Sequence, residues 1–79
     1  MKITVLYFAS LRDAAGCARE ACDVPAGGLA ALYEALRVRY GFALPRERVR
    51  VAVNGAFADW SMALAGGEEV AFIPPVSGG

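Results

Sequence analysis

The sequence predicts one α+β domain, a mixed sheet of about four to five strands with one main helix packed on one face. Segments rich in β-branched and aromatic residues stand near both ends of the chain, as is typical of strands. Between them lies a single stretch with helical periodicity. An Asn-Gly dipeptide, the strongest short signal for a β-hairpin, follows that stretch. With 79 residues, the chain is expected to build one compact core.

The first third of the chain predicts two strands joined by a helical turn. Residues 2–8 read KITVLYF and form the first strand; residues 18–25 form the second, antiparallel to it. The turn covers residues 9–16, with Ser10 as its N-cap and Gly16 as its end. Alternation along the first strand places Ile3, Val5 and Tyr7 on one face, and Thr4, Leu6 and Phe8 on the other.

The main helix is predicted over residues 29–40, and Gly41 ends it. A further strand over residues 49–53 turns back at Asn54-Gly55, and the last strand covers residues 70–73. The apolar stripe of the helix consists of Leu29, Leu32, Tyr33, Leu36 and Tyr40.

This order of elements indicates a β-grasp, or ubiquitin-like, fold, in which the first and last strands lie parallel at the centre of the sheet. Phe8, Phe57 and Ile73 then share the face opposite the helix. A single helix leaves that face uncovered, and grouped exposed apolar residues mark an interaction site. The alternative is that strand twist or the loop at residues 59–65 covers them.

Composition narrows the function. The eight Lys and Arg residues balance the eight Asp and Glu residues, so no net charge favours nucleic acid or an anionic membrane. No apolar run approaches the roughly 18 residues of a membrane span, and no signal-peptide cleavage site follows the first strand. We therefore expect a cytoplasmic protein. The arginines between positions 37 and 50 either face an acidic partner or form a solvated edge.

Side-chain chemistry is sparse. Cys17 and Cys22 fit neither a redox pair nor a zinc knuckle, and the chain has no histidine, so no metal site is predicted. The two cysteines are expected to be reduced, with a regulatory disulfide as the alternative. The sequence contains no phosphate loop, nucleophilic elbow or histidine base. The chain is therefore expected to supply a reacting group rather than a catalytic site.

The C-terminal segment offers such a group. Pro74 and Pro75 remove two backbone donors, so the last strand must leave the sheet there, and we place the domain at residues 1–75 and a flexible tail at residues 76–79. Gly78 and Gly79 carry no Cβ atom, so they fit a channel too narrow for other residues. The reactive group would be the terminal carboxylate.

Three segments resemble one family over nearly the whole chain: VLYFASLRDAAG near the start, VAVNG before the hairpin, and GGEEVAFIPPVSGG at the end. The chain resembles the MoaD family, the small sulfur-carrying subunits of molybdopterin synthase. The resemblance implies that an E1-like enzyme adenylates the Gly79 carboxylate with ATP, and that a sulfur donor converts it to a thiocarboxylate. The tail then enters the large subunit, in a heterotetramer, and gives its sulfur to a cyclic pterin precursor during molybdenum cofactor biosynthesis.

The resemblance also implies roles for particular residues. Gly79 would carry the sulfur, Gly78 would give access, and the chain itself would bind no cofactor. Arg12 would contact the large subunit, although an ordinary surface ion pair with Asp13 or another nearby acid is the alternative. The remaining partner-binding residues would be Phe8, Phe57, Ile73, Pro74, Pro75, Val76 and Ser77.

Three other functions share such a tail. A thiamin thiazole sulfur carrier ends in the same Gly-Gly, although such carriers tend to be shorter and to lack the PPVSGG run. A ubiquitin-like modifier would join its carboxylate to lysines of target proteins. A plain interaction domain would leave the Gly-Gly unused.

Overall fold

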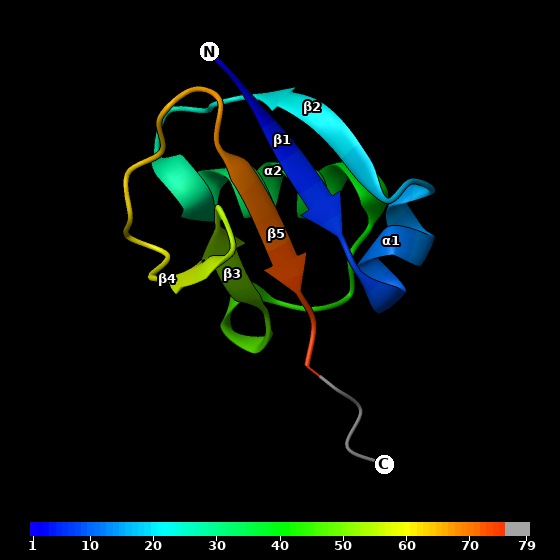
Figure 1. The fold of residues 1–79 in the computed structure, drawn as a ribbon. Helices are drawn as coiled ribbons and strands as arrows, with labels where there is room; N and C mark the ends of the chain where they lie inside the picture. Colours follow the sequence, from blue (N-terminus) through cyan, green and yellow to red (C-terminus); the bar gives the residue numbers. More distant parts are fainter. Residues whose placement is uncertain (76–79) are drawn as a thin grey trace.

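A computed structural model describes residues 1–75 of the chain. Its elements are β1 (Lys2–Tyr7), α1 (Ala9–Ala15), β2 (Arg19–Asp23), α2 (Gly28–Tyr40), the short 3-10 helix η1 (Arg46–Arg48), β3 (Arg50–Val53), β4 (Ala56–Ala58) and β5 (Glu69–Ile73). Figure 1 shows the strands as one layer with α2 lying across the back of it. Among these residues, no helix has the length and apolar character needed to span a bilayer.

The sheet has five strands in the order β2-β1-β5-β3-β4. The first and last strands, β1 and β5, are adjacent and parallel, in register from Thr4 opposite Glu69 to Tyr7 opposite Phe72. The other three pairings are antiparallel. This is the β-grasp arrangement, so the predicted fold class is confirmed, including the mixed sheet and the single main helix.

The core lies between the sheet and α2, and strand alternation explains which residues enter it. Every second side chain of β1 is buried, and Val70 and Phe72 of β5 are buried beside them. The same face of α2 predicted from the sequence, with Leu29 and Leu36 among its residues, packs against these strands. The predicted orientation of both central strands is therefore confirmed.

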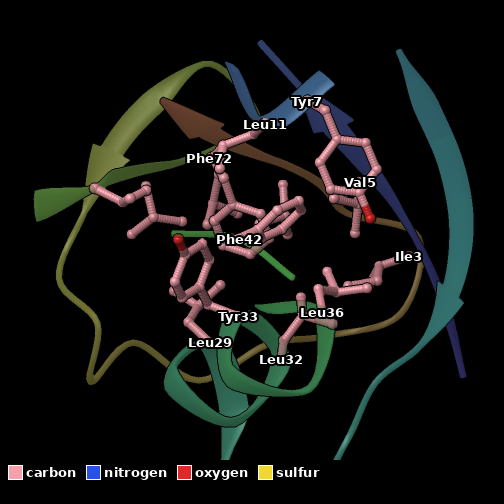
Figure 2. Packing of buried hydrophobic residues seen from close by; sticks show 14 residues of the cluster. Ile3, Val5, Tyr7, Leu11, Leu29, Leu32, Tyr33, Leu36, Phe42 and Phe72 are labelled. Atoms are coloured by element: carbon pink, nitrogen blue, oxygen red, sulfur yellow. The ribbon is translucent and has the colours of Figure 1, made fainter. Parts of the chain in front are cut away.

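Aromatic rings fill the centre of this core. Figure 2 shows Phe42 among the side chains of Tyr33 and Phe72, and the rings of Tyr33 and Phe42 stack with their centroids 5.9 Å apart. Trp60 stacks on Phe72 from the edge of the core, with a centroid distance of 5.9 Å. Trp60 belongs to the segment at residues 59–65, so this part of the loop packs on the helix side of the sheet and not over the outer face.

The junction between β1 and α1 differs from the sequence prediction. Ser10 lies inside α1 and is not its N-cap, so that prediction was wrong. Phe8 occupies the N-cap position with an extended backbone, and its carbonyl oxygen accepts hydrogen bonds from the amides of Leu11 and Arg12. Ala9 adopts a positive φ of 50°, which alanine rarely does. The chain therefore turns sharply at the end of β1, one residue earlier than predicted.

The predicted hairpin at Asn54-Gly55 is confirmed. Both residues have positive φ, 51° and 86°, as a two-residue turn between right-handed twisted strands requires. The carbonyl oxygen of the Asn54 side chain accepts a hydrogen bond from the amide of Glu69 at 2.9 Å. The turn is thereby attached to β5, next to the start of that central strand.

Both cysteines are free thiols, Cys17 in the bend after α1 and Cys22 in β2. Ala18, next to Cys17, pairs with Tyr7 at the end of β1, whereas Cys22 pairs with Ile3 near the start of β1. These two partners are separated by about 13 Å at about 3.3 Å per strand residue, which exceeds the Cα distance that a disulfide spans. A disulfide between the two would require the edge of the sheet to rearrange.

Candidate partner-binding face

The face of the sheet opposite α2 carries an apolar groove of about 250 Å³. We call it the outer groove. Only one of its lining residues, Glu69, is charged. The lining residues come from β1, β3, β4, β5 and the adjoining turns: Leu6, Phe8, Ala52, Gly55, Phe57, Glu69, Ala71 and Ile73.

Strand alternation builds this groove. Leu6 lies opposite Ala71 across the parallel β1–β5 pairing, and Ala52 lies opposite Ala71 across the β3–β5 pairing. The alanines supply little side-chain volume, so a depression remains between larger neighbours. Phe8 and Phe57 stand on its rim with 44% and 62% of their surface exposed. Large exposed rings around an apolar depression are typical of a protein–protein contact site.

Arg50 extends this surface beyond the groove. Its guanidinium carbon lies 4.1 Å from the centroid of the Phe57 ring, which is a cation–π contact. Arg50 also lies directly opposite Ile73 in the β3–β5 ladder. A positive charge therefore stands at the end of the groove next to the point where the chain leaves β5.

The structure brings together three of the residues predicted to bind a partner, because Phe8, Phe57 and Ile73 line one groove. Arg12 lies exposed on α1, outside the groove lining, and forms no ion pair with an acid in residues 1–75. Pro74 is half-buried and Pro75 is exposed directly after the last ladder residue. Val76, Ser77, Gly78 and Gly79 lie outside the described residues, as does the proposed boundary of the tail.

Sequence reasoning missed several members of this surface. Ala52, Ala71 and Arg50 are small or charged, so apolar grouping did not select them as site residues. The alternation of side chains along β3 could have identified two of them. Val51 and Val53 point to the core, so their neighbours Arg50 and Ala52 must point outward. The Arg50 contact with Phe57 needed the pairing register of β3 with β4 as well.

Outside the outer groove, the described residues offer neither a reactive thiol at Cys22 nor a metal site. Burial is the largest cause that raises the pKa of the Cys22 thiol, with a further contribution from the nearby Glu20 charge. A raised pKa keeps this thiol protonated, so it is a poor nucleophile. No group of three or more Cys, Asp and Glu residues in the described range is placed to hold a metal ion.

The Glu20 carboxylate is held by two tyrosine hydroxyls. Its Oε1 atom accepts hydrogen bonds from the hydroxyls of Tyr40, at 2.6 Å, and Tyr7, at 2.5 Å. Burial favours a higher pKa for Glu20, but the two hydrogen bonds and the charge of Arg39 outweigh it and hold the pKa below its ordinary value. Burial, and then the bond to Glu20, raise the pKa of Tyr7.

Comparison with known proteins places the chain in a family. The model of the ThiS family matches residues 5–79. The chain is 40% identical over 86 aligned residues to the molybdopterin synthase sulfur carrier subunit of Mycobacterium tuberculosis, covering 100% of this chain and 99% of the relative. It is 36% identical to that of Escherichia coli, covering 98% and 99%. SAMP1 from Haloferax volcanii has the same fold, with a TM-score of 0.80, 28% identity and full coverage of both chains. The chain therefore belongs to the ThiS family, and the molybdopterin synthase sulfur carrier subunits are its relatives over almost all of the aligned length.

Proposed function

We propose that this chain is the sulfur carrier of a molybdopterin synthase and that the carboxylate of Gly79 carries the sulfur. The observation that supports this most strongly is the 40% identity, over the whole length of both chains, to a molybdopterin synthase sulfur carrier subunit. The carrier acts through its terminal carboxylate and supplies no catalytic side chain. Gly78 gives that carboxylate access to narrow active sites, because it has no Cβ atom.

The chemistry proceeds in two steps at Gly79. A carboxylate oxygen first attacks the α-phosphorus of ATP in an E1-like enzyme, and pyrophosphate leaves. Sulfide released by a sulfur donor then attacks the activated carbonyl carbon, the bond from that carbon to the phosphate oxygen breaks, AMP leaves, and a thiocarboxylate remains. The first step is needed because a free carboxylate resists nucleophiles, whereas an acyl phosphate has a good leaving group. The chain binds no cofactor of its own in this scheme, and ATP belongs to the activating enzyme.

The partner of the charged carrier is the large subunit of the synthase. The outer groove provides the contact, with Phe8, Phe57 and Ile73 as apolar anchors and Arg50 beside them. The segment that connects this contact to the reacting carboxylate consists of Pro74, Pro75, Val76 and Ser77. Arg12, on α1, is a further contact with the large subunit. Held in this way, the tail delivers sulfur to a cyclic pterin precursor in the large subunit's active site.

The test is intact-mass spectrometry of the protein before and after incubation with the E1-like enzyme, ATP and a sulfur donor. We expect a species in which one oxygen is replaced by sulfur, located at Gly79 by fragmentation. A chain lacking Gly79 is the matched control. If only the unmodified carboxylate is found with all three components present, the carrier function is wrong.

The choice between two carrier functions needs the acceptor as well. The thiocarboxylated chain is expected to yield molybdopterin when it is mixed with the large subunit and the cyclic pterin. Transfer to a thiazole synthase instead would favour the thiamin pathway. Conjugation of Gly79 to lysine side chains would favour a protein modifier, a function suggested by the likeness to a chain called small archaeal modifier protein 1.

A further inference from the structure

The strand β2 is an open edge of the sheet. It is the outermost strand on its side, and within residues 1–75 it pairs only with β1. Figure 1 shows β2 along the border of the sheet, with α2 behind the sheet and α1 beside the end of β1. One side of the β2 backbone is therefore available to a further strand.

The register shows which backbone groups are available. The amide of Tyr7 donates to the carbonyl of Ala18, and the amide of Val24 donates to the carbonyl of Met1, each at 2.9 Å. Ladder bonds to β1 therefore fall on the even-numbered residues from 18 to 24, because bonded and non-bonded positions alternate in an antiparallel pair. Arg19, Ala21 and Asp23 direct their amides and carbonyls away from β1.

The side chains of these three residues are exposed and share one face. They lie opposite Leu6, Thr4 and Lys2 of β1, on the face of the sheet away from α2. Along the free edge, a positive charge at Arg19 is followed by the small Ala21 and a negative charge at Asp23. Arg19 and Asp23 therefore carry opposite charges, and each lies two residues from Ala21. The Asp23 carboxylate also forms an exposed ion pair with Lys2 on β1, at 3.1 Å through Oδ1, and its second oxygen can accept a further partner.

We propose that two copies of this chain pair along β2, antiparallel and about a two-fold axis at Ala21, to form a continuous ten-stranded sheet. In this register, a residue of one copy faces the residue of the other copy whose number brings the sum of the two to 42. Arg19 of each copy lies opposite Asp23 of the other, so two interchain ion pairs form, and Ala21 meets its own counterpart. The free amides and carbonyls at all three positions become paired in both copies.

The charges select this register. A two-fold axis at Asp23 would place two carboxylates opposite each other, and an axis at Arg19 would place two guanidinium groups opposite each other. Like charges directly across a ladder destabilise the pairing. Charged residues on an edge strand usually prevent association. Here they disfavour the neighbouring registers and favour the one centred on Ala21.

The pairing is compatible with the proposed carrier function. The outer groove is lined by residues of β1, β3, β4, β5 and the adjoining turns, and β2 contributes none of them. On the other face of β2, the Glu20 carboxylate is held by Tyr7 and Tyr40 of its own chain. Each copy therefore keeps its groove open while β2 is paired.

Sedimentation equilibrium and small-angle scattering from about 1 µM to about 1 mM protein test the proposal, because a short edge-to-edge contact is expected to be weak. The average mass of the unmodified chain should rise toward twice that of the monomer. Arg19→Asp and Asp23→Arg should each weaken self-association by about tenfold or more, since each places two pairs of like charges across the ladder. Arg48→Asp, a charge reversal on η1 away from the edge, is the matched control and should leave it unchanged.

Mixing the two variants provides the decisive step. Arg19→Asp carries two negative charges at the edge and Asp23→Arg carries two positive ones, so an equimolar mixture should form the mixed dimer although neither variant self-associates. Circular dichroism of each variant checks that the fold is retained. A chain that stays monomeric throughout the concentration range, a dimer that survives both substitutions, or a mixture that fails to associate would each overturn the proposal. None of these outcomes depends on sulfur transfer at Gly79.

Discussion

The hydroxyl of Tyr40, the last residue of α2, donates a hydrogen bond to Oε1 of Glu20 on β2. Tyr7 of β1 donates to the same oxygen, and the rings of Tyr7 and Tyr40 meet edge to face with centroids 6.0 Å apart. One carboxylate therefore connects the edge strand to the neighbouring strand and to the end of the helix. Hydrogen bonds to a charged acceptor are stronger than those to a neutral one.

Glu20→Gln is expected to lower the free energy of unfolding by about 1–2 kcal/mol at pH 7, a range reduced for the partial exposure of the group. The folded-state pKa of Glu20 is depressed, so its stabilisation is complete above the unfolded pKa and is lost as the pH falls through the folded value. Urea unfolding across this range should show the two proteins converging in acid. Tyr40→Phe should produce a smaller loss. A difference that persists undiminished in acid would contradict this role for the Glu20 charge.

Phe8→Asp should weaken binding to the large subunit by about tenfold to a hundredfold, because it places a charge on the rim of the outer groove. The fold should tolerate it, since Phe8 is 44% exposed and stands at the N-cap of α1, where aspartate is favoured. Calorimetric titration with the large subunit measures the loss. Val38→Asp, at a position on α2 with 73% exposure, is the control for an added charge elsewhere. If Phe8→Asp unfolds the domain, the assignment of Phe8 to the binding face is wrong.

Removing Gly79, or adding one residue after it, should abolish formation of the thiocarboxylate, because the reacting carboxylate is displaced. The free energy of unfolding should change by no more than about 0.5 kcal/mol, since the ladder of β5 ends at Ile73. Intact-mass spectrometry and urea unfolding measure the two effects. One residue added before Met1 is the control for length. Thiocarboxylate on the extended chain would show that the carboxylate position is not critical.

Arg50 and Phe57 are expected to be coupled by about 0.5–1 kcal/mol, as is typical of an exposed cation–π contact. A double-mutant cycle with Arg50→Ala and Phe57→Ala, followed by urea unfolding, measures the coupling. Additive effects of the two substitutions would indicate that the contact contributes nothing to folding. In that case, Arg50 would remain available for a partner's acidic group.

Local patterns were enough to predict the sheet and its helix. Alternation in β1 placed Ile3 and Tyr7 on one face, which the structure buries, and Phe8 on the opposite face. The Asn54-Gly55 turn was readable because its two positive φ angles suit few other residues. In both cases, the information lies within a few neighbouring residues.

Features that depend on distant contacts were missed. Phe42 and Trp60 lie in segments without periodicity, yet they complete the core through ring contacts with Tyr33. In the sequence, Glu20 does not differ from an ordinary exposed strand residue. Its hydrogen bonds come from Tyr7 and Tyr40, which only the packing of β1 and α2 brings close to it. The prediction of Ser10 as a cap failed because the backbone turned at Phe8 and Ala9, where neither side chain carries a cap signal.

The central position of β5 has a mechanical consequence. Four residues of β5 pair with β1 on one side and four with β3 on the other. A force applied at Pro75 along the strand would load both ladders in shear, so the hydrogen bonds would have to yield together rather than open one after another. A pull on the end of this chain would therefore not peel the strand from the sheet one bond at a time.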